Sequence, residues 1–479
     1  MWWERAVVYQ IYPRSFQDAD GDGLGDLRGA TRRLAYVASL GAQAVWLSPF
    51  YPSPDHDFGY DVTDFYAIDP RLGTFADLDA LLAEARHLGL RVLLDLVPCH
   101  TSIEHPWFRE RPDFYVIRDT PESPNNWRAS FGGSAWSRDP HGRGWYLHSF
   151  FPEQPDLDWR NPEVVHAMQD VVRFWLGRGI DGLRLDALDR LMKDPELRDD
   201  PPRRGPPPLP LDPEHATLEH VHSRNAPDIG TGLAALRAAA GDRLLVGEVY
   251  LQNAELRPYL RHVDLAFSFE LYHAPFRVDA IRAAIASAVE QPGIAWVLSN
   301  HDFKRLPDRV GPENVRVAAL LLLTLPGCAF VYQGDELGVP EGPAAPVPLD
   351  RHGRDVFRNP MPWEDGEGAG FTTGTPWLPV ATAPGGNVAG QQRDPDSLLS
   401  LYRRLIALRA KLPASGLRFE PCPEPDVLAY RRGEHLVVVN LGDEPAALPA
   451  GEVVLSTEPE RGRDPTLLPP HAGVDVRWG

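Results

Sequence analysis

The chain has 479 residues, with 67 Asp and Glu against 48 Lys and Arg, so its formal net charge is -19. A surface this acidic repels phosphate groups, which argues against nucleic acid and anionic membranes as partners and favours a small neutral ligand. The hydrophobic fraction of 43% and the aromatic fraction of 10% are typical of a globular protein, so a largely disordered chain is excluded.

Cysteine content and hydropathy indicate the compartment in which the protein is located. Only Cys99, Cys328 and Cys422 occur, which are too few and too scattered for a disulfide framework or a CxxC metal site. The first residues lack a basic segment followed by an apolar run, and no apolar stretch approaches the roughly 20 residues that span a bilayer. We therefore expect a cytoplasmic protein with reduced cysteines. We also expect a monomer or homodimer without an organic cofactor.

Eight short apolar runs alternate with helical patterns along the chain, as in βα units that build a parallel sheet. The runs are 6–13, 44–51, 91–98, 182–188, 244–250, 265–270, 295–300 and 328–333. Eight runs predict an α/β fold closed into a (β/α)8 TIM barrel. Such a barrel uses roughly 250 residues, so the remaining length predicts additional modules.

Two crossover helices of this barrel have clear signals. Between the second and third runs, apolar residues in 78–85 keep helical spacing, with Thr74 placed to cap the start and Gly89 to end the helix. Before the fourth run, Asn161 supplies a cap and Pro162 a first-turn proline, and an apolar stripe follows. Both segments are predicted to pack on the outside of the barrel.

Composition shifts divide the chain into domains. Residues 1–100 and 168–414 are predicted to form the two parts of the barrel, with a loop insert at 340–395, and 101–167 an inserted irregular domain after strand 3. From 415 to 479 short strands follow one another, including a hairpin around Gly433, and predict a C-terminal antiparallel β-sandwich. The proline-rich segment 199–228 is either a flexible linker or a loop on the rim of the barrel.

Polar residues follow the predicted strands where a TIM barrel carries its reactive groups, at the carboxyl ends. These residues are His100 after the third run, Arg184 and Asp186 in the fourth, Glu248 in the fifth, and His301 and Asp302 after the seventh. Each alone is more simply a structural charge at the barrel rim, but such a set spread over four strands is improbable by chance.

Three carboxylates at separate strand ends suit glycoside hydrolysis, in which one carboxylic acid protonates the leaving oxygen while a carboxylate attacks or guides water. Arg184 lies two positions before Asp186, so both side chains point to the same face of a strand. The guanidinium can hold that carboxylate ionised and oriented, as a nucleophile requires.

Several segments in the same order resemble the conserved regions of the α-amylase superfamily (glycoside hydrolase family 13), and within it the α-glucosidase and oligo-1,6-glucosidase branch. The resemblance runs from the first strand into the C-terminal domain, which makes it far more specific than one short motif. The segments are Val8 to Pro13 with Ser15-Phe16, Asp95 to His100, Gln154 to Asp158, Gly182 to Ala187, Gly247-Glu248, and Asn300 to Asp302.

The resemblance implies roles for the residues at the strand ends. Asp186 matches the nucleophile that forms a β-glucosyl ester, and Glu248 matches the general acid that later activates water. Asp302 matches the carboxylate that stabilises the transition state through the glucose hydroxyls. His100 and His301 match histidines that bind the same sugar, whereas a lone histidine is more often a satisfied core residue.

The same resemblance implies a pocket closed at the non-reducing end of the substrate. Asp57 resembles the carboxylate that binds the terminal hydroxyls, and Tyr60 the aromatic platform beneath the ring, so exo action is expected. Arg358 resembles another sugar-binding residue. Phe131 and Phe150 match aromatic residues of the pocket wall, with ordinary core packing as an equal alternative.

Residues 18–26 place acidic side chains at alternate positions among glycines, a pattern suited to a hard cation. An EF-hand is excluded because position twelve of the loop is Gly29, where a bidentate glutamate is needed. The family carries a calcium loop here, so the resemblance implies structural Ca²⁺, or alternatively Mg²⁺. A solvated acidic turn is the alternative. The implied ligands are Asp18, Asp20, Asp22, the Leu24 carbonyl and Asp26.

Cys99 stands where the superfamily usually has an asparagine that ligates a second calcium, so a second calcium site is not expected. Nothing near Cys99 in the sequence except His100 promotes a thiolate, and we expect an inert side chain. Ala187, directly after the nucleophile, resembles the smaller residue of members that cleave α-1,4 linkages, which favours maltose-type substrates. The run from Lys193 to Pro202 resembles α-glucosidases that also accept sucrose.

Three functions remain open for a protein with these residues. The first is hydrolysis of terminal α-glucosidic bonds in short oligosaccharides or glucosides with retained configuration. The second is transfer of glucose to a sugar or alcohol through the same intermediate; isomerisation is disfavoured because Phe303 to Val310 lacks the Arg-Leu-Asp-Arg-Asp segment of sucrose isomerases. The third, a silent binding subunit, is remote because the carboxylates are all present.

Overall fold

The computed structural model describes residues 1–382, 385–448, 450–459 and 466–477. Residues 383–384 of the expected loop insert, and residues 449, 460–465 and 478–479 of the expected C-terminal domain, lie outside the described part. None of the helices in the described part is long and apolar enough to cross a membrane.

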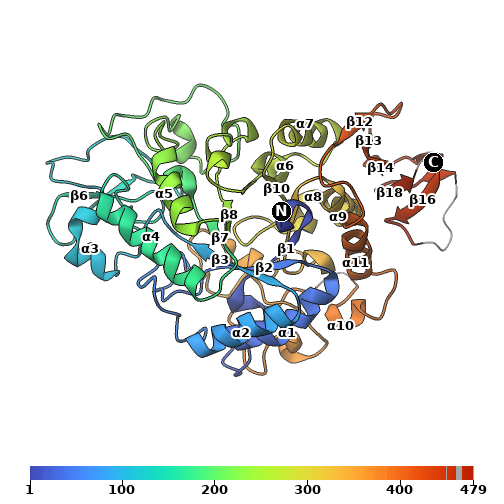
Figure 1. Ribbon diagram of the computed structural model, residues 1–479, viewed down its shortest axis with the longest axis horizontal. Helices are drawn as coiled ribbons and strands as arrows, with labels where there is room; N and C mark the ends of the chain where they lie inside the picture. Colours follow the sequence, from blue (N-terminus) through green and yellow to red (C-terminus); the bar gives the residue numbers. More distant parts are fainter. Residues whose placement is uncertain (383–384, 449, 460–465, 478–479) are drawn as a thin grey trace. The chain divides into compact units, whose positions relative to one another are not determined.

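Eight strands form a closed barrel in the order β1-β11-β10-β9-β8-β7-β3-β2, which confirms the predicted TIM barrel (Figure 1). Each lies within one of the eight apolar runs or overlaps it, because strands of a parallel barrel are buried on both faces. The strands are β1 (Val7–Ile11), β2 (Ala44–Leu47), β3 (Arg91–Leu96), β7 (Gly182–Leu185), β8 (Leu244–Gly247), β9 (Leu265–Phe267), β10 (Ile294–Val297) and β11 (Cys328–Tyr332).

Helices follow most of the barrel strands. Those described are α1 (Leu27–Leu40), α2 (Phe75–His87), α3 (Pro106–Glu110), α4 (Pro162–Gly177), α5 (Gly230–Ala240), α6 (Phe269–His273), α7 (Val278–Val289), α8 (Leu306–Val310), α9 (Val315–Thr324), α10 (Val388–Gln391) and α11 (Leu398–Arg409).

The predicted caps of α2 and α4 are confirmed. The Thr74 hydroxyl accepts from the Asp77 amide at 3.3 Å, and the Asp77 carboxylate accepts from the Thr74 amide at 2.8 Å. The Asn161 side chain accepts from the Glu163 amide, and Pro162 is the first residue of α4. Both caps satisfy amides that have no partner inside their own helix.

The described residues form two compact units. The first unit comprises 1–46, 79–91 and 270–479, and the second comprises 47–78 and 92–269. In the second unit β3, β7, β8 and β9 are parallel neighbours. Their register pairs Asp95 with Arg184 and Leu185 with Gly247, so Asp95 lies beside Arg184, and Asp186 and Glu248 each follow a paired position.

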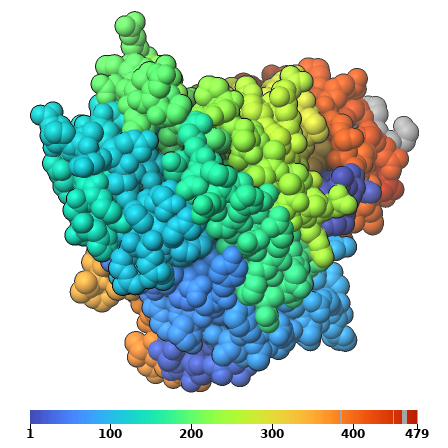
Figure 2. Space-filling model, turned by 60° about the vertical axis from the view of Figure 1, so that its left-hand side comes forward, coloured from blue at the N-terminus to red at the C-terminus, as the bar shows by residue number. Residues whose placement is uncertain are grey.

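An inserted segment between β3 and α4 carries a small antiparallel sheet in the order β4-β6-β5, with β4 (Ile117–Arg118), β5 (Trp136–Arg138) and β6 (Trp145–Leu147). The proline-rich segment 199–228 lies against it on the surface of the second unit (Figure 2, cyan and green). The Gly133 amide donates to Glu214 at 2.8 Å, and Asn126 bonds the backbone of Asp200 in both directions. The segment is therefore a folded loop of this unit and not a flexible linker.

The first unit ends in a five-stranded antiparallel sheet of order β12-β13-β14-β18-β16 and a two-stranded sheet β15-β17. Gly433 adopts φ 64° in the predicted hairpin between β13 and β14, as a two-residue turn requires. The sheet lies beside α9 and α11 (Figure 1). Its strands are β12 (Arg418–Glu420), β13 (Val427–Arg432), β14 (His435–Asn440), β15 (Ala446–Ala447), β16 (Glu452–Ser456), β17 (Leu467–Leu468) and β18 (Ala472–Arg477).

Candidate active site

Three carboxyl groups of the second unit share one guanidinium. Arg184 on β7 contacts Asp95 at 2.8 Å and Asp186 at 2.7 Å through Nη1, and Glu248 at 2.7 Å through Nη2. The arginine is 1% exposed. A buried guanidinium that binds carboxylates through both terminal nitrogens fixes their positions, because its fork is planar and rigid. The predicted pairing of Arg184 with Asp186 is present, and Glu248 belongs to the same group.

The cluster has three carboxyl groups and one guanidinium, and burial makes the excess negative charge unfavourable. Burial raises the pKa of Asp95 to about 6. Burial also raises the pKa of Asp186, while Arg184 acts in the opposite direction and the neighbouring Glu248 adds to the rise. Three carboxyls that face one guanidinium therefore keep a proton up to a higher pH than free carboxyls do, and this proton belongs to the cluster as a whole. A carboxyl pair that shares one proton can supply both an acid and a carboxylate.

Asp186 and Glu248 are neighbours at the ends of two adjacent strands. Leu185 and Gly247 are register partners, so each acid is the next residue of its chain. Neighbouring strands lie about 4.8 Å apart, so the two acids start from adjacent backbone positions, and both carboxylates reach the terminal nitrogens of one guanidinium. Ala187, at φ 47°, turns its amide toward the Glu248 carboxylate at 3.2 Å.

The predicted sugar-binding residues of the second unit also lie together. The Gln154 amide donates to Asp57 at 2.9 Å and lies 3.0 Å from Nε2 of His100. The Tyr60 hydroxyl donates to Asp95 at 2.9 Å, and the Tyr60 carbonyl lies 3.1 Å from His100 Nε2. These contacts connect Asp57, Tyr60 and His100 to the acid cluster around Arg184.

His100 is buried and has one ring nitrogen that is unpaired within the described part of the chain. Its Nδ1 is buried and has no hydrogen-bond partner among the residues that the structure describes. Burial lowers the pKa of His100, so the neutral imidazole is favoured. Phe150 lies against this ring at a centroid distance of 5.2 Å, and Phe131 lies 5.5 Å from Phe150. Both phenylalanines are half-buried, so they pack beside the predicted sugar-binding histidine.

The first unit holds a second group of predicted residues around Asp302. Its carboxylate accepts from Arg358 at 3.0 Å and Arg354 at 3.1 Å, and lies 3.2 Å from His301 Nε2. The Arg358 Nε donates to the His301 carbonyl at 2.9 Å. His301, Asp302 and Arg358 are therefore brought together, as their common role in the sequence interpretation requires.

The first 415 residues decide the family. The family model described as "Alpha amylase, catalytic domain" matches residues 10–415, most of the chain.

The chain belongs to the α-amylase family.

Individual proteins of the family are similar over nearly the whole chain. A probable α-glucosidase of Rhizobium meliloti is 41% identical, over 86% of this chain and 83% of that protein. Maltase 1 of Drosophila virilis is 38% identical, over 85% of this chain and 72% of that protein. The crystal structure of an α-glucosyl transfer enzyme superposes with a TM-score of 0.91 at 37% identity and covers 99% of each chain. Residues 422–474 match a domain of unknown function, DUF3459.

The loop in which the α-amylase family carries calcium has an oxygen-rich donor set. Ligand atoms of Asp18, Asp20 and Asp22 lie within 4.8 Å of one another, and the last two side chains are exposed. Carboxylate oxygens are the ligands that Ca²⁺ and Mg²⁺ prefer, so this part of the prediction fits. The Asp26 carboxylate instead accepts from the Gly29 and Ala19 amides, where it caps α1. Asp26 is not part of that group of three.

A lysine lies beside Cys99, where many amylases ligate a second calcium. Lys193 Nζ contacts Asp156 at 2.6 Å and the Cys99 thiol at 3.9 Å, and is 5% exposed. Burial raises the pKa of Cys99, so the thiol is favoured over the thiolate. The buried ammonium supplies the positive charge that Asp156 needs, and the protonated thiol agrees with the expectation of an inert cysteine.

Sequence reasoning missed several residues that hold the predicted ones. Asp95 had a visible signal, because it is the one acid inside the apolar run 91–98. Asp350 and Arg354 had none: Asp350 lies 3.0 Å from Arg358 and 2.7 Å from Arg354, and all three follow a long irregular stretch. Lys193 also had none, because a lysine in a polar run normally points to solvent.

Proposed function

We propose that the protein is a retaining, exo-acting α-glucosidase that hydrolyses terminal α-glucosidic bonds of short oligosaccharides or glucosides. The observation that carries this proposal is the contact of Asp186 and Glu248, each at 2.7 Å, with the two terminal nitrogens of Arg184. It supports a pair of acids placed as near neighbours, which a covalent glucosyl intermediate requires.

The proposed reaction has two displacements. In the first, a carboxylate oxygen of Asp186 attacks the anomeric carbon, the bond to the leaving oxygen breaks, and Glu248 gives its proton to that oxygen. In the second, Glu248 takes a proton from water, the water oxygen attacks the same carbon, and the ester bond to Asp186 breaks. Each step inverts the carbon, so the product keeps the α configuration.

The remaining residues are assigned to binding. Asp57 and His100 are assigned to sugar hydroxyls and Tyr60 to the ring face, the roles that the family resemblance gives them. Asp302 and His301 are assigned to hydroxyls of the same glucose, the role that the family resemblance gives them. Because Asp57 is fixed by Gln154 and by the Asp61 carboxylate, which accepts from its amide at 3.0 Å, it is suited to bind the terminal hydroxyls in a closed pocket.

Maltose-type linkages and sucrose are the proposed substrates, supported by the small Ala187 after the nucleophile and by relatives named α-glucosidase and maltase. The test incubates the protein with maltose, isomaltose, sucrose, trehalose and kojibiose and separates the products by chromatography. Glucose is expected from maltose or sucrose. Cleavage of long starch chains without action on any disaccharide contradicts exo action.

Glucosyl transfer is the second candidate, and the likeness to a solved α-glucosyl transfer enzyme favours it. The same ester on Asp186 reacts with an alcohol or sugar hydroxyl in place of water. Adding glycerol to the maltose reaction separates the two: transfer gives glucosylglycerol at the expense of free glucose, and strict hydrolysis gives glucose alone.

The loop with Asp18, Asp20 and Asp22 is assigned to structural calcium. The ion would offset the mutual repulsion of the three carboxylates, and in the described part of the chain Asp20 also pairs with Arg28 at 2.5 Å. Calcium is then expected to raise the melting temperature over that in EDTA, and Asp22→Asn to remove the difference. An equal melting temperature with both additions contradicts the assignment.

The cytoplasm is the proposed location. All three cysteines are free, and Cys99 and Cys328 are buried, which suits a reducing compartment.

A further inference from the structure

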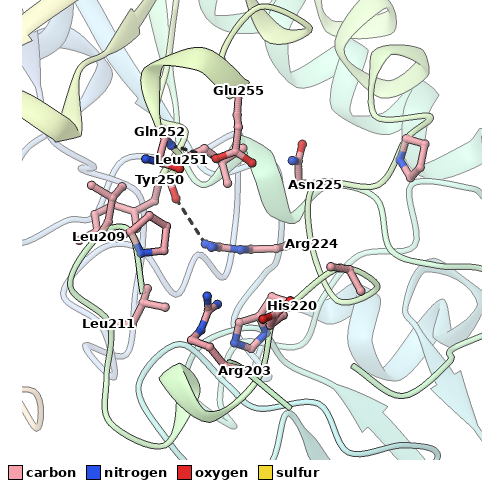
Figure 3. Close-up of a pocket in the computed structure, with 14 residues that line it drawn as sticks. Arg203, Leu209, Leu211, His220, Arg224, Asn225, Tyr250, Leu251, Gln252 and Glu255 are labelled. Carbon is pink, nitrogen blue, oxygen red and sulfur yellow. Dashed lines mark hydrogen bonds between the residues drawn. The ribbon is translucent and has the colours of Figure 1, made fainter. Parts of the chain in front are cut away.

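A pocket separate from the residues assigned so far lies in the second unit (Figure 3). Its volume is about 410 Å³. One wall comes from the loop 199–228 that follows β7, and the other from the residues that follow β8, including Tyr250 and Glu255. The chain thus builds this pocket from the loops of the same two strands that carry Asp186 and Glu248.

Arg224 in this pocket is a buried cation with few partners. It is 8% exposed, yet among the described residues it makes one hydrogen bond, from Nη1 to the Tyr250 carbonyl at 3.3 Å. The nearest carboxylate, Asp189, lies 3.6 Å away, and its Oδ2 has no hydrogen-bond partner in the described part of the chain. A guanidinium has five N–H donors, and leaving them unpaired in a protein interior is costly.

A second guanidinium faces the same space. Arg203 donates through Nε to the Ala216 carbonyl at 3.1 Å and through Nη2 to the Leu218 carbonyl at 2.9 Å. Figure 3 shows the side chains of Arg203 and Arg224 pointing toward the same part of the pocket from different loops. Both side chains carry a positive charge, and an anion bound between them relieves their mutual repulsion.

The other ionisable groups of the lining are already engaged. Glu219 accepts from the Arg204 amide at 3.1 Å, and Glu255 accepts from the Gln252 amide at 3.2 Å. His220 bonds Ser223 and the His215 carbonyl. Burial and the nearby Arg190 lower the pKa of Arg224, while Asp189, Glu255 and Tyr259 act in the opposite direction.

We propose that this pocket binds an oxyanion, a carboxylate or a phosphate monoester, through Arg224 and Arg203. Leu209, Leu211 and Tyr250 form an apolar side of the pocket, so the oxyanion is part of a larger molecule with an apolar or ring-shaped body. The Tyr250 hydroxyl donates to the Pro210 carbonyl at 2.8 Å, which ties the two loops together at this side.

The places of the pocket residues in the chain indicate which molecule carries the oxyanion. Asp189 follows Asp186 by three residues, and Tyr250 follows Glu248 by two. A glucoside held by the acid pair would extend its leaving group toward the loops after β7 and β8. The preferred ligand is therefore a glucoside with an acidic leaving group, an assignment that rests on the proposed α-glucosidase function. Binding of the oxyanion by itself does not depend on that function.

The first arm of the test measures binding of inorganic phosphate by calorimetry, against chloride at the same ionic strength. The wild-type protein is expected to bind phosphate saturably. Arg203→Gln and Arg224→Gln are each expected to weaken binding by about 5- to 10-fold or more, since each removes a charge-assisted contact. The exposed Arg173→Gln, which breaks an ion pair with Asp170 on α4, is the matched control. No saturable binding, or equal binding in all variants, overturns the proposal.

The second arm compares 4-nitrophenyl α-glucoside with its analogue that carries a carboxylate on the ring. A higher kcat/KM for the acidic substrate, and a smaller preference in Arg203→Gln, identify the leaving group as the source of the oxyanion. Phosphate binding without that preference supports a site for a free anionic ligand. If neither glucoside is cleaved but phosphate binds, the α-glucosidase proposal fails and the oxyanion site stands.

Discussion

Arg184 and Arg224 are both buried guanidinium groups of the second unit, but their surroundings differ. Arg184 has three carboxylates within 2.8 Å, whereas Arg224 has one carbonyl at 3.3 Å and its nearest carboxylate at 3.6 Å. A fully paired charge organises the groups around it. An underpaired charge beside a cavity keeps donors for a ligand. The first arrangement suits chemistry, and the second suits recognition.

The largest expected effect follows from removing the nucleophile. Asp186→Asn keeps the shape of the side chain and removes its ability to form the ester, so kcat on maltose falls by on the order of 10⁴-fold or more. Steady-state kinetics with circular dichroism of both proteins measures this. Asp170→Asn, the same change in an exposed ion pair of α4, should keep full activity. Activity of Asp186→Asn within tenfold of wild type removes Asp186 from the reaction.

Replacing the guanidinium of Arg184 without removing its charge should give the next largest fall in kcat. Arg184→Lys has one nitrogen in place of the fork that contacts Asp186 and Glu248 separately. We expect kcat to fall by roughly 10²- to 10³-fold with a smaller change in KM, because the acids lose their fixed spacing and not the sugar contacts. An effect confined to KM indicates that Arg184 only assists binding.

The acid cluster should control the pH profile. Activity needs one retained proton, so the rate falls at high pH as the cluster loses it and at low pH as the nucleophile becomes protonated. The charge of Asp95 raises the pKa of Asp186. Asp95→Asn is therefore expected to shift the acidic limb of kcat/KM toward lower pH. An acidic limb unchanged in Asp95→Asn shows that the charge of Asp95 does not act on the nucleophile.

The last prediction compares how replacing Arg184 and replacing Arg224 change the free energy of unfolding. Arg184→Met leaves three acids without their cation and is expected to lower the free energy of unfolding by about 3–5 kcal/mol. Arg224→Met removes a poorly paired charge, so the change is expected to stay within about 1 kcal/mol. Urea unfolding of both variants, with Arg173→Met as control, measures the difference. Equal destabilisation by both changes makes Arg224 a structural charge and weakens the case for an oxyanion site.

The barrel and the acids were accessible from the sequence for a physical reason. Parallel barrel strands are buried on both faces and therefore appear as short apolar runs, and their carboxyl ends carry the polar residues. Asp186 and Glu248 were recognised as members of that set, and the family resemblance gave each its role. The hairpin at Gly433 and the caps at Thr74 and Asn161 were also predictable, because their signals lie within a few residues of each other.

Other parts depend on contacts between distant segments. The pairing of Asp95 with Arg184 follows from the register of β3 and β7, which no local pattern specifies. The pocket at Arg224 needs the loop 199–228, whose prolines leave a linker and a rim loop open until the bonds to the inserted segment are known. Lys193 beside Asp156 is a long-range ion pair of the same kind.

The configuration of the first product tests the central claim most directly. Proton nuclear magnetic resonance can follow the anomeric signals of glucose during the first minutes of maltose or aryl α-glucoside cleavage, before mutarotation mixes the two forms. A covalent glucosyl intermediate on Asp186, with Glu248 on the neighbouring strand as acid and base, predicts that α-glucose appears first. First appearance of β-glucose contradicts it, because a single displacement by water inverts the anomeric carbon.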